Sequence, residues 1–145
     1  MAGTHALGGF VTVQKGIFAC TIAQVEAANG VLATLAVPNK ATILDVILEV
    51  TDMDSSTGLL IDVGDASGPA TADDNRFIAA FTGQAAGIIR ASDSAGLLEG
   101  TYTYRNLKGT DDSQIEQEIE ATVNTVATTG VAGTLTLTVI YFVAQ

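Results

Sequence analysis

The sequence is poor in the residues that carry most catalytic and metal-binding chemistry. It has one cysteine, Cys20, one histidine, His5, and no tryptophan. An intramolecular disulfide is therefore excluded, and we expect Cys20 to occupy a buried apolar strand position. A Ser-His-Asp or Cys-His site would need His5 as its base, but His5 lies in residues 1–9, a segment of small residues that predicts a flexible arm. We therefore predict no catalytic residues of either kind.

Carboxylates are the one catalytic residue type that is abundant. A glycosidase needs only two of them, and the sequence has sixteen Asp and Glu, so composition leaves that reaction open. Sugar clefts usually contain aromatic platforms, however, and the absence of tryptophan argues against one. The sequence also has no glycine-rich phosphate loop followed by a lysine. We predict a protein that is not an enzyme.

Basic residues and long apolar runs are scarce as well. Six Lys and Arg against sixteen Asp and Glu give a net charge of -10, which repels phosphate backbones and predicts no direct nucleic-acid contact. No apolar run reaches the roughly 18 residues of a membrane helix. The first residues lack the basic and apolar segments of a secretory signal. We expect a soluble protein that binds neither nucleic acid nor membrane.

Charged residues make up only 15% of the chain, whereas apolar residues make up 48%. Because so few charges cannot cover the apolar surface of a lone monomer, we expect a homo-oligomer. The length of 145 residues suits one domain, which can bury about two-thirds of its unfolded surface. We divide the chain into the flexible N-terminal arm, residues 1–9, and a single domain, residues 10–145.

Alternating apolar residues and turn dipeptides predict strands along the whole domain. Val11 and Val13 alternate with polar residues, and Gly16 separates them from the next apolar run. The dipeptide Asn29-Gly30 predicts a tight hairpin between strands at residues 17–27 and 31–37. Further strands are expected at 59–63, at 77–81 with Phe77, Ala79 and Phe81 on one face, at 88–89, at 101–105 and at 134–143.

Two segments, residues 41–50 and 113–126, fit both the strand period of two and a helical stripe. Ser113 and Glu116 even match a helix capping box. The β-branched content of both segments favours strands. Eight to ten strands with short turns predict an all-β chain that folds as a single-domain antiparallel β-sandwich of the jelly-roll type. The expected inward-facing residues are Leu44, Val46, Leu48 and Val50 in the first segment and Ile115, Gln117, Ile119, Ala121 and Val123 in the second.

The sharpest candidate site is an acidic loop. Its aspartates offer the hard oxygen ligands that calcium accepts, but their spacing matches no EF-hand or calcium repeat. Aspartates also cap turns and solvate loops, and this structural role is the favoured interpretation. We therefore expect no cofactor. The candidate calcium ligands are Asp62, Asp65, Asp73 and Asp74, with Asp52 and Asp54 one turn earlier.

Two further groups have a structural and a functional interpretation. Glu116, Glu118 and Glu120 alternate along one strand, where they form either a solvated face or a charged face that meets basic residues of a partner. Tyr102 and Tyr104 share a strand face and could form a glycan platform, although core packing is the favoured role.

The order of these segments resembles small structural proteins of tailed-phage virions, above all capsid decoration (cement) proteins with a β-sandwich. The resemblance covers residues from about 31 to the C-terminus. It implies a trimer on the outer surface of the icosahedral shell, made in the host cytoplasm, that clamps neighbouring subunits of the major capsid protein. Related sandwiches in head fibres or tails leave a receptor- or glycan-binding module as the alternative. The resemblance rests on residues 36–51, Ile61-Asp-Val-Gly-Asp65, Asn75-Arg-Phe-Ile78, Tyr102-Thr-Tyr104 and Gly133-Thr-Leu-Thr-Leu-Thr-Val-Ile-Tyr141.

Overall fold

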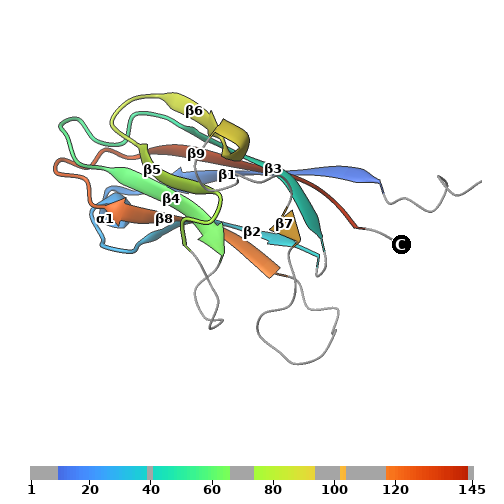
Figure 1. Ribbon diagram of the computed structural model, residues 1–145. Coiled ribbons are helices and arrows are strands. Elements are labelled where there is room, and N and C mark those ends of the chain that lie inside the picture. Colours follow the sequence, from blue (N-terminus) through green and yellow to red (C-terminus); the bar gives the residue numbers. More distant parts are fainter. Residues whose placement is uncertain (1–9, 39–40, 66–73, 94–101, 104–116, 144–145) are drawn as a thin grey trace, which may run out of the picture.

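The computed structural model describes residues 10–38, 41–65, 74–93, 102–103 and 117–143. In these residues the chain forms two antiparallel β-sheets that stack face to face, as the sequence predicts (Figure 1). Sheet A contains β1 (Val11–Cys20), β9 (Gly133–Phe142), β3 (Thr42–Val50) and β6 (Gly87–Arg90) in that order, with β7 (Tyr102–Thr103) paired to β3. Sheet B contains β2 (Val31–Val37), β8 (Gln117–Thr125), β4 (Leu60–Asp65) and β5 (Ile78–Thr82).

The strand order is that of a jelly roll. Leaving the short β7 aside, each connection crosses from one sheet to the other except the one between β4 and β5, which are neighbours in sheet B. Two short helices, α1 (Ile22–Val25) and the 3-10 helix η2 (Ala91–Asp93), lie in the connections. Among the described residues no helix is long and apolar enough to cross a membrane. The predicted jelly-roll sandwich is therefore confirmed.

The core lies between the sheets and follows the strand period of two. Along β9, Leu135, Leu137 and Val139 are fully buried, whereas the threonines between them face outward. The predicted inward residues Ile119, Ala121 and Val123 of β8 are buried in the same way. Ile115 and the side chain of Gln117 lie outside the described residues.

The predicted hairpin at Asn29-Gly30 is wrong, because the strands before and after this turn do not pair with each other. Asn29 does adopt the left-handed conformation of a tight turn, with φ 57. However, β1 ends at Cys20, and Thr21 and Gln24 form a capping box that starts α1. The helix separates the two strands, so β1 pairs with β9 in sheet A and β2 pairs with β8 in sheet B.

Gly16 does not interrupt β1, contrary to expectation. The strand continues through it because the ring of Phe18 fills the space that a side chain at position 16 would need, only 2.5 Å from an added Cβ. An aromatic ring that covers a glycine replaces the packing that the glycine lacks. The predicted break is therefore a point of close packing.

The strand at 41–50 is confirmed as β3, but its inward set is wrong at one position. The register with β9 shifts between Ile43 and Asp45, which is the signature of a β-bulge. Ile43 is fully buried, whereas Leu44 is only partly buried. The bulge also brings the side chain of Asp45 into a buried position.

The predicted common face of Phe77, Ala79 and Phe81 is also wrong. β5 begins at Ile78, and Phe77 and Ile78 are both fully buried while Ala79 is exposed. Ala80 adopts φ 53, which breaks the alternation. Of the strand predicted at 101–105, the described part is the two-residue β7. The arm at residues 1–9, with His5, and Tyr104 lie outside the described residues.

Leu137 provides a test of this core. We expect Leu137→Ala to destabilise the protein by about 2–5 kcal/mol, because it leaves a cavity beneath the central strand of sheet A. Thr138→Ala is the matched control, since it alters the next residue of β9 on the opposite face and should cost less than about 1 kcal/mol. Denaturant unfolding at one fixed protein concentration measures both. Equal losses would contradict the assignment of the inward face.

Candidate functional site

The outer face of sheet A carries large aliphatic side chains on its two edge strands. Val11 and Val13 on β1 are each 63% exposed, Ile17 on the same strand is 69% exposed, and Ile88 on β6 is 64% exposed. Single exposed aliphatic residues are common, but a group on one sheet face marks a contact surface. This surface, called the sheet A face below, is the candidate functional site.

The strand register places these residues in rows across the face. In one row Ile17 lies beside Thr136, which lies beside Glu49, which lies beside Ile88. The next row runs across the same four strands and mixes charge with an aliphatic residue; it contains Lys15, Thr138, Ile47 and Arg90. The most exposed apolar side chains therefore lie on the edge strands, and threonines and the partly buried Ile47 lie between them.

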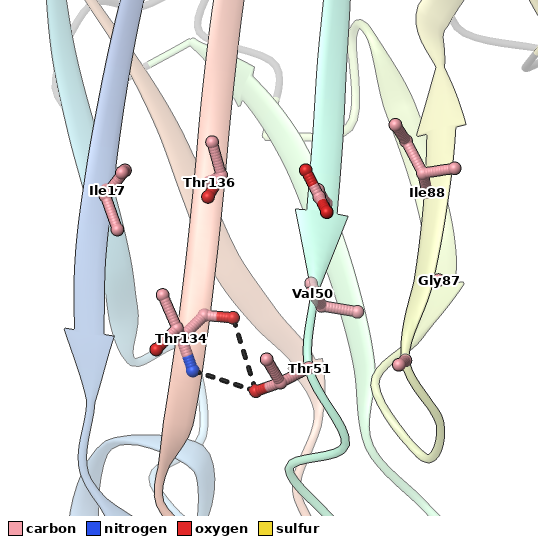
Figure 2. Close-up of a pocket in the computed structure, with 9 residues that line it drawn as sticks. Ile17, Val50, Thr51, Gly87, Ile88, Thr134 and Thr136 are labelled. Atoms are coloured by element: carbon pink, nitrogen blue, oxygen red, sulfur yellow. Dashed lines mark hydrogen bonds between the residues drawn. The ribbon is translucent and has the colours of Figure 1, made fainter.

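A shallow groove of about 560 Å³ lies on this face, with Ile17 at one side and Ile88 at the other (Figure 2). Thr51, just after β3, is one of the lining residues: its hydroxyl accepts a hydrogen bond from the backbone N–H of Thr134 at 2.9 Å and donates to the Thr134 carbonyl at 3.4 Å. Among the lining residues Glu49 is the ionisable one. An open groove with a single carboxylate suits contact with a protein surface better than catalysis.

Charge on the sheet A face is balanced. Arg90 donates to Asp45 at 2.8 Å, and Ser92 donates to the same carboxylate through its backbone N–H and its hydroxyl at 3.3 Å. Lys15 and Glu49 lie on neighbouring rows, and their side chains form no hydrogen bond or ion pair in the described part of the chain. Among the described residues, the face thus has two acidic groups, Asp45 and Glu49, and two basic groups, Lys15 and Arg90.

The outer face of sheet B is polar and acidic by contrast. On β8 the inward residues alternate with Glu118, Glu120 and Thr122, which point away from the core. Thr34 on the neighbouring β2 is exposed on the same face. The sequence predicted this charged strand face; Glu116 lies outside the described residues. The two outer faces of the sandwich therefore differ in chemistry.

Asp54 is a structural hub. Its buried carboxylate accepts hydrogen bonds from four backbone N–H groups and from the Ser56 hydroxyl, at distances from 3.1 to 3.2 Å. Burial by itself raises the pKa of this carboxyl, but the four N–H donors outweigh burial and lower the pKa to about 2. The hub joins the loop after β3 to the loop after β8; the N–H donors belong to Ser56, Leu59, Thr128 and Thr129.

Asp62 also has a structural role. Its carboxylate accepts 2.7 Å hydrogen bonds from the backbone N–H of Ala80 and from the side-chain amide of Asn124. These bonds hold β5 and β8 on either side of β4, and the bond to Ala80 supports its positive φ. Asp62 is therefore satisfied by protein donors.

The other candidate calcium ligands are not brought together in the described residues. Asp74 is exposed, and Asp52 accepts a hydrogen bond from the backbone N–H of Asp54 at 3.2 Å. The side chain of Asp65 and all of Asp73 lie outside the described residues. Among the residues described, no group of three or more His, Cys, Asp or Glu side chains could hold a metal ion.

Cys20 is buried, as expected, and its thiol contacts the Phe18 carbonyl at 3.8 Å. Burial raises the pKa of the thiol above its ordinary value, which keeps it protonated. Tyr102 pairs with Ile43 through the backbone, and its side chain lies outside the description. Both interpretations of Tyr102 and Tyr104, core packing and the glycan platform, stay predictions.

Sequence reasoning missed the sheet A face, although the signal is present in β1. Both sides of this strand are partly apolar, and the valines of the apolar alternation suggest that Val11 and Val13 face the core. The structure shows the opposite: Gly16, Phe18 and Cys20 occupy the inward side. A strand that is apolar on both sides indicates contacts on both sides.

No protein-family model and no curated protein matches the sequence. The fold does match chains in solved phage capsid structures. A chain of the cyanophage Pam1 capsid asymmetric unit has a TM-score of 0.69 and 23% identity, over 99% of this chain and 91% of that chain. A chain of the Ralstonia phage GP4 capsid has a TM-score of 0.66 and 25% identity, over 95% and 87%.

A third match is a chain of the acid-stable capsid of Helicobacter pylori bacteriophage KHP30, with a TM-score of 0.58 and 19% identity over 95% of this chain and 91% of that chain. All three likenesses span nearly the full length of both chains. The protein thus has a jelly-roll fold found in chains of phage capsids. The resemblance to phage virion proteins seen in the sequence is confirmed at this level.

The hydrogen bonds to the Asp54 carboxylate predict how the stability of the fold depends on pH. Because its folded-state pKa lies near 2, below its ordinary 3.8, the hub stabilises the fold above about pH 4 and loses this contribution as pH falls toward 2. We expect Asp54→Asn to lower the Tm at neutral pH by about 5 °C or more. The difference in Tm between the variant and the wild type should shrink between pH 4 and pH 2.

Asp74→Asn is the matched control, because Asp74 is an exposed aspartate without a hydrogen bond in the described residues. Thermal unfolding followed by circular dichroism across this pH range measures all three proteins. A difference in Tm between wild type and Asp54→Asn that stays constant down to pH 2 would show that the charge of the Asp54 carboxylate does not stabilise the loops.

Proposed function

We propose that this protein is a structural component of a phage virion, and that it decorates the outer surface of the capsid as a trimer that bridges neighbouring subunits of the major capsid protein. The observation that carries the proposal is the likeness to capsid chains over nearly the full length of both chains. A jelly roll embedded in a much larger enzyme would match only part of its counterpart. Because the fold alone does not define a function, the surface chemistry must agree with it.

The surface does agree with a role in protein assembly. The sheet A face offers aliphatic side chains and a shallow groove, as protein interfaces do. The net charge of -10 opposes contact with packaged nucleic acid. An acidic protein on the outside of a shell keeps its charge away from the genome.

Stabilisation follows from binding that depends on the lattice. A protein that contacts two coat subunits at once binds the assembled shell much more tightly than an isolated coat subunit, because the second contact is intramolecular. Its binding free energy is then added to the stability of the closed shell. The acidic excess of the chain supports a partly electrostatic contact with basic coat residues.

The second candidate is a receptor- or glycan-binding module on a head fibre or tail. The groove between Ile17 and Ile88 favours it, since Glu49, Thr134 and Thr136 place oxygen atoms along an open surface. The two functions differ in what the purified protein binds. A decoration protein binds capsids that lack it, whereas a receptor module binds host-surface glycan.

The test compares phage particles with and without the protein. We expect particles that carry it to release their DNA at a temperature about 5 °C or more above bare particles, because its binding stabilises only the closed shell. Adding purified protein back to bare particles should restore the difference. Salt of about 1 M should reduce it, since the Debye length falls to about 3 Å.

Isolated coat subunits are the binding control, and we expect them to retain little or none of the protein. Equal DNA-release temperatures, with or without added protein, would contradict the decoration role. Binding to host-surface glycan but not to capsids would establish the second candidate in its place.

A further inference from the structure

The monomer leaves one extended apolar surface uncovered. Four aliphatic side chains on the sheet A face are more than 60% exposed, on the edge strands β1 and β6. Between them lie partly buried Ile47, Ile140 and Phe142, so the apolar surface continues across the sheet. Water contact with such a surface is unfavourable.

The β1 edge adds unpaired backbone groups to this surface. β1 is ten residues long and pairs with β9 on one side, while its other side has no strand partner among the described residues. Natural edge strands are usually protected by proline, by charge or by being short. β1 has no proline, and its charged residue is Lys15. The edge and the face are therefore both suited to bind another chain.

The balanced charge of the sheet A face favours a second copy of this chain as the partner. The chain as a whole has ten more acidic than basic residues, yet the sheet A face carries Lys15 and Arg90 against Asp45 and Glu49. Two copies can therefore approach through this face without the repulsion that their total charge creates elsewhere. The side chains of Lys15 and Glu49, both without an ion-pair partner in the described monomer, have the opposite charges that a contact between the two margins of this face needs.

The positions of these groups define how copies pack. Lys15 lies on β1 at one margin of the face, and Glu49 lies toward the opposite margin, on β3 beside β6. We infer that the sheet A face binds a second copy of this chain, with the β1 side of one copy against the β3 and β6 side of the next. Such a head-to-tail contact closes into a ring when the rotation allows it. The inference rests on the proposed function only for the expectation that copies assemble as a trimer.

The first test removes the apolar contact. Ile17→Asp places a carboxylate on the β1 side of the interface, and we expect the dissociation constant of the oligomer to rise about 30-fold or more. Thr34→Asp is the matched control, because it adds the same charge at an exposed strand position on sheet B. Sedimentation from about 1 to 100 µM measures the mass, and circular dichroism verifies the fold.

The second test exchanges the charges of Lys15 and Glu49, and its result does not depend on whether Ile17→Asp folds. Lys15→Glu should weaken self-association about tenfold, because like charges then face each other across the interface. The combination of Lys15→Glu with Glu49→Lys should restore it to within about threefold, since every copy carries both changes. A face that bound coat protein would not recover, because the coat does not carry the exchange.

Three results would overturn the inference: a wild-type protein that stays monomeric throughout this range, equal effects of Ile17→Asp and Thr34→Asp, or no recovery in the charge exchange. The proposed function is judged separately, by capsid binding. A protein that self-associates through this face but does not bind shells would refute the proposed function alone. A protein that binds shells as a monomer would refute the inference alone.

Discussion

The pairing of β9 with β1 and β3 is the interaction on which the rest of the structure depends. β9 comes last in the chain, yet it pairs with β1 over all ten of its residues and with β3 on its other side. The paired residues are between 85 positions (Val50 and Leu135) and 131 positions (Val11 and Phe142) apart in sequence, and the jelly-roll connectivity follows from these contacts. They also fix the two sides of sheet A: Leu135, Leu137 and Val139 enter the core, and the opposite side becomes the surface that carries the site.

The aspartates that first suggested a metal site stabilise the irregular parts of the same fold. Asp54 joins two loops at one end of the sandwich, Asp62 holds β5 and β8 against β4, and Asp45 sits at the bulge of β3 with Arg90. Each replaces strand pairing where the backbone departs from regular geometry. Buried carboxylates that are fully hydrogen-bonded stabilise a fold without any further ligand. The acidic character of this chain is thus partly structural.

The fold could be predicted from the sequence to the level of an all-β jelly roll, because alternation in 134–143 and 117–125 and the β-branched residues are local signals. The strand partners could not be predicted from the sequence. A turn such as Asn29-Gly30 determines where the chain reverses, but it does not determine which strand pairs with the strand that follows. The bulge between Ile43 and Asp45 depends on cross-strand register, which local sequence does not determine. The candidate site was missed because Val11 and Val13 have the pattern of core residues. Their outward direction becomes visible only in the folded sheet, where both are 63% exposed and Phe18 covers Gly16 on the other side of β1.

The central claim is that this jelly roll lies on a phage shell with its sheet A face covered by another copy of itself. A density map of the virion at a resolution that separates strands tests it most directly. If the protein decorates the shell and binds its neighbours through the sheet A face, the map shows jelly-roll densities on the outer surface of the shell. In these densities β1 of each copy lies against β3 and β6 of a neighbour, and the acidic face of sheet B lies away from that contact. A map in which the sheet A face is open to solvent, or in which the shell carries no such density, would contradict it.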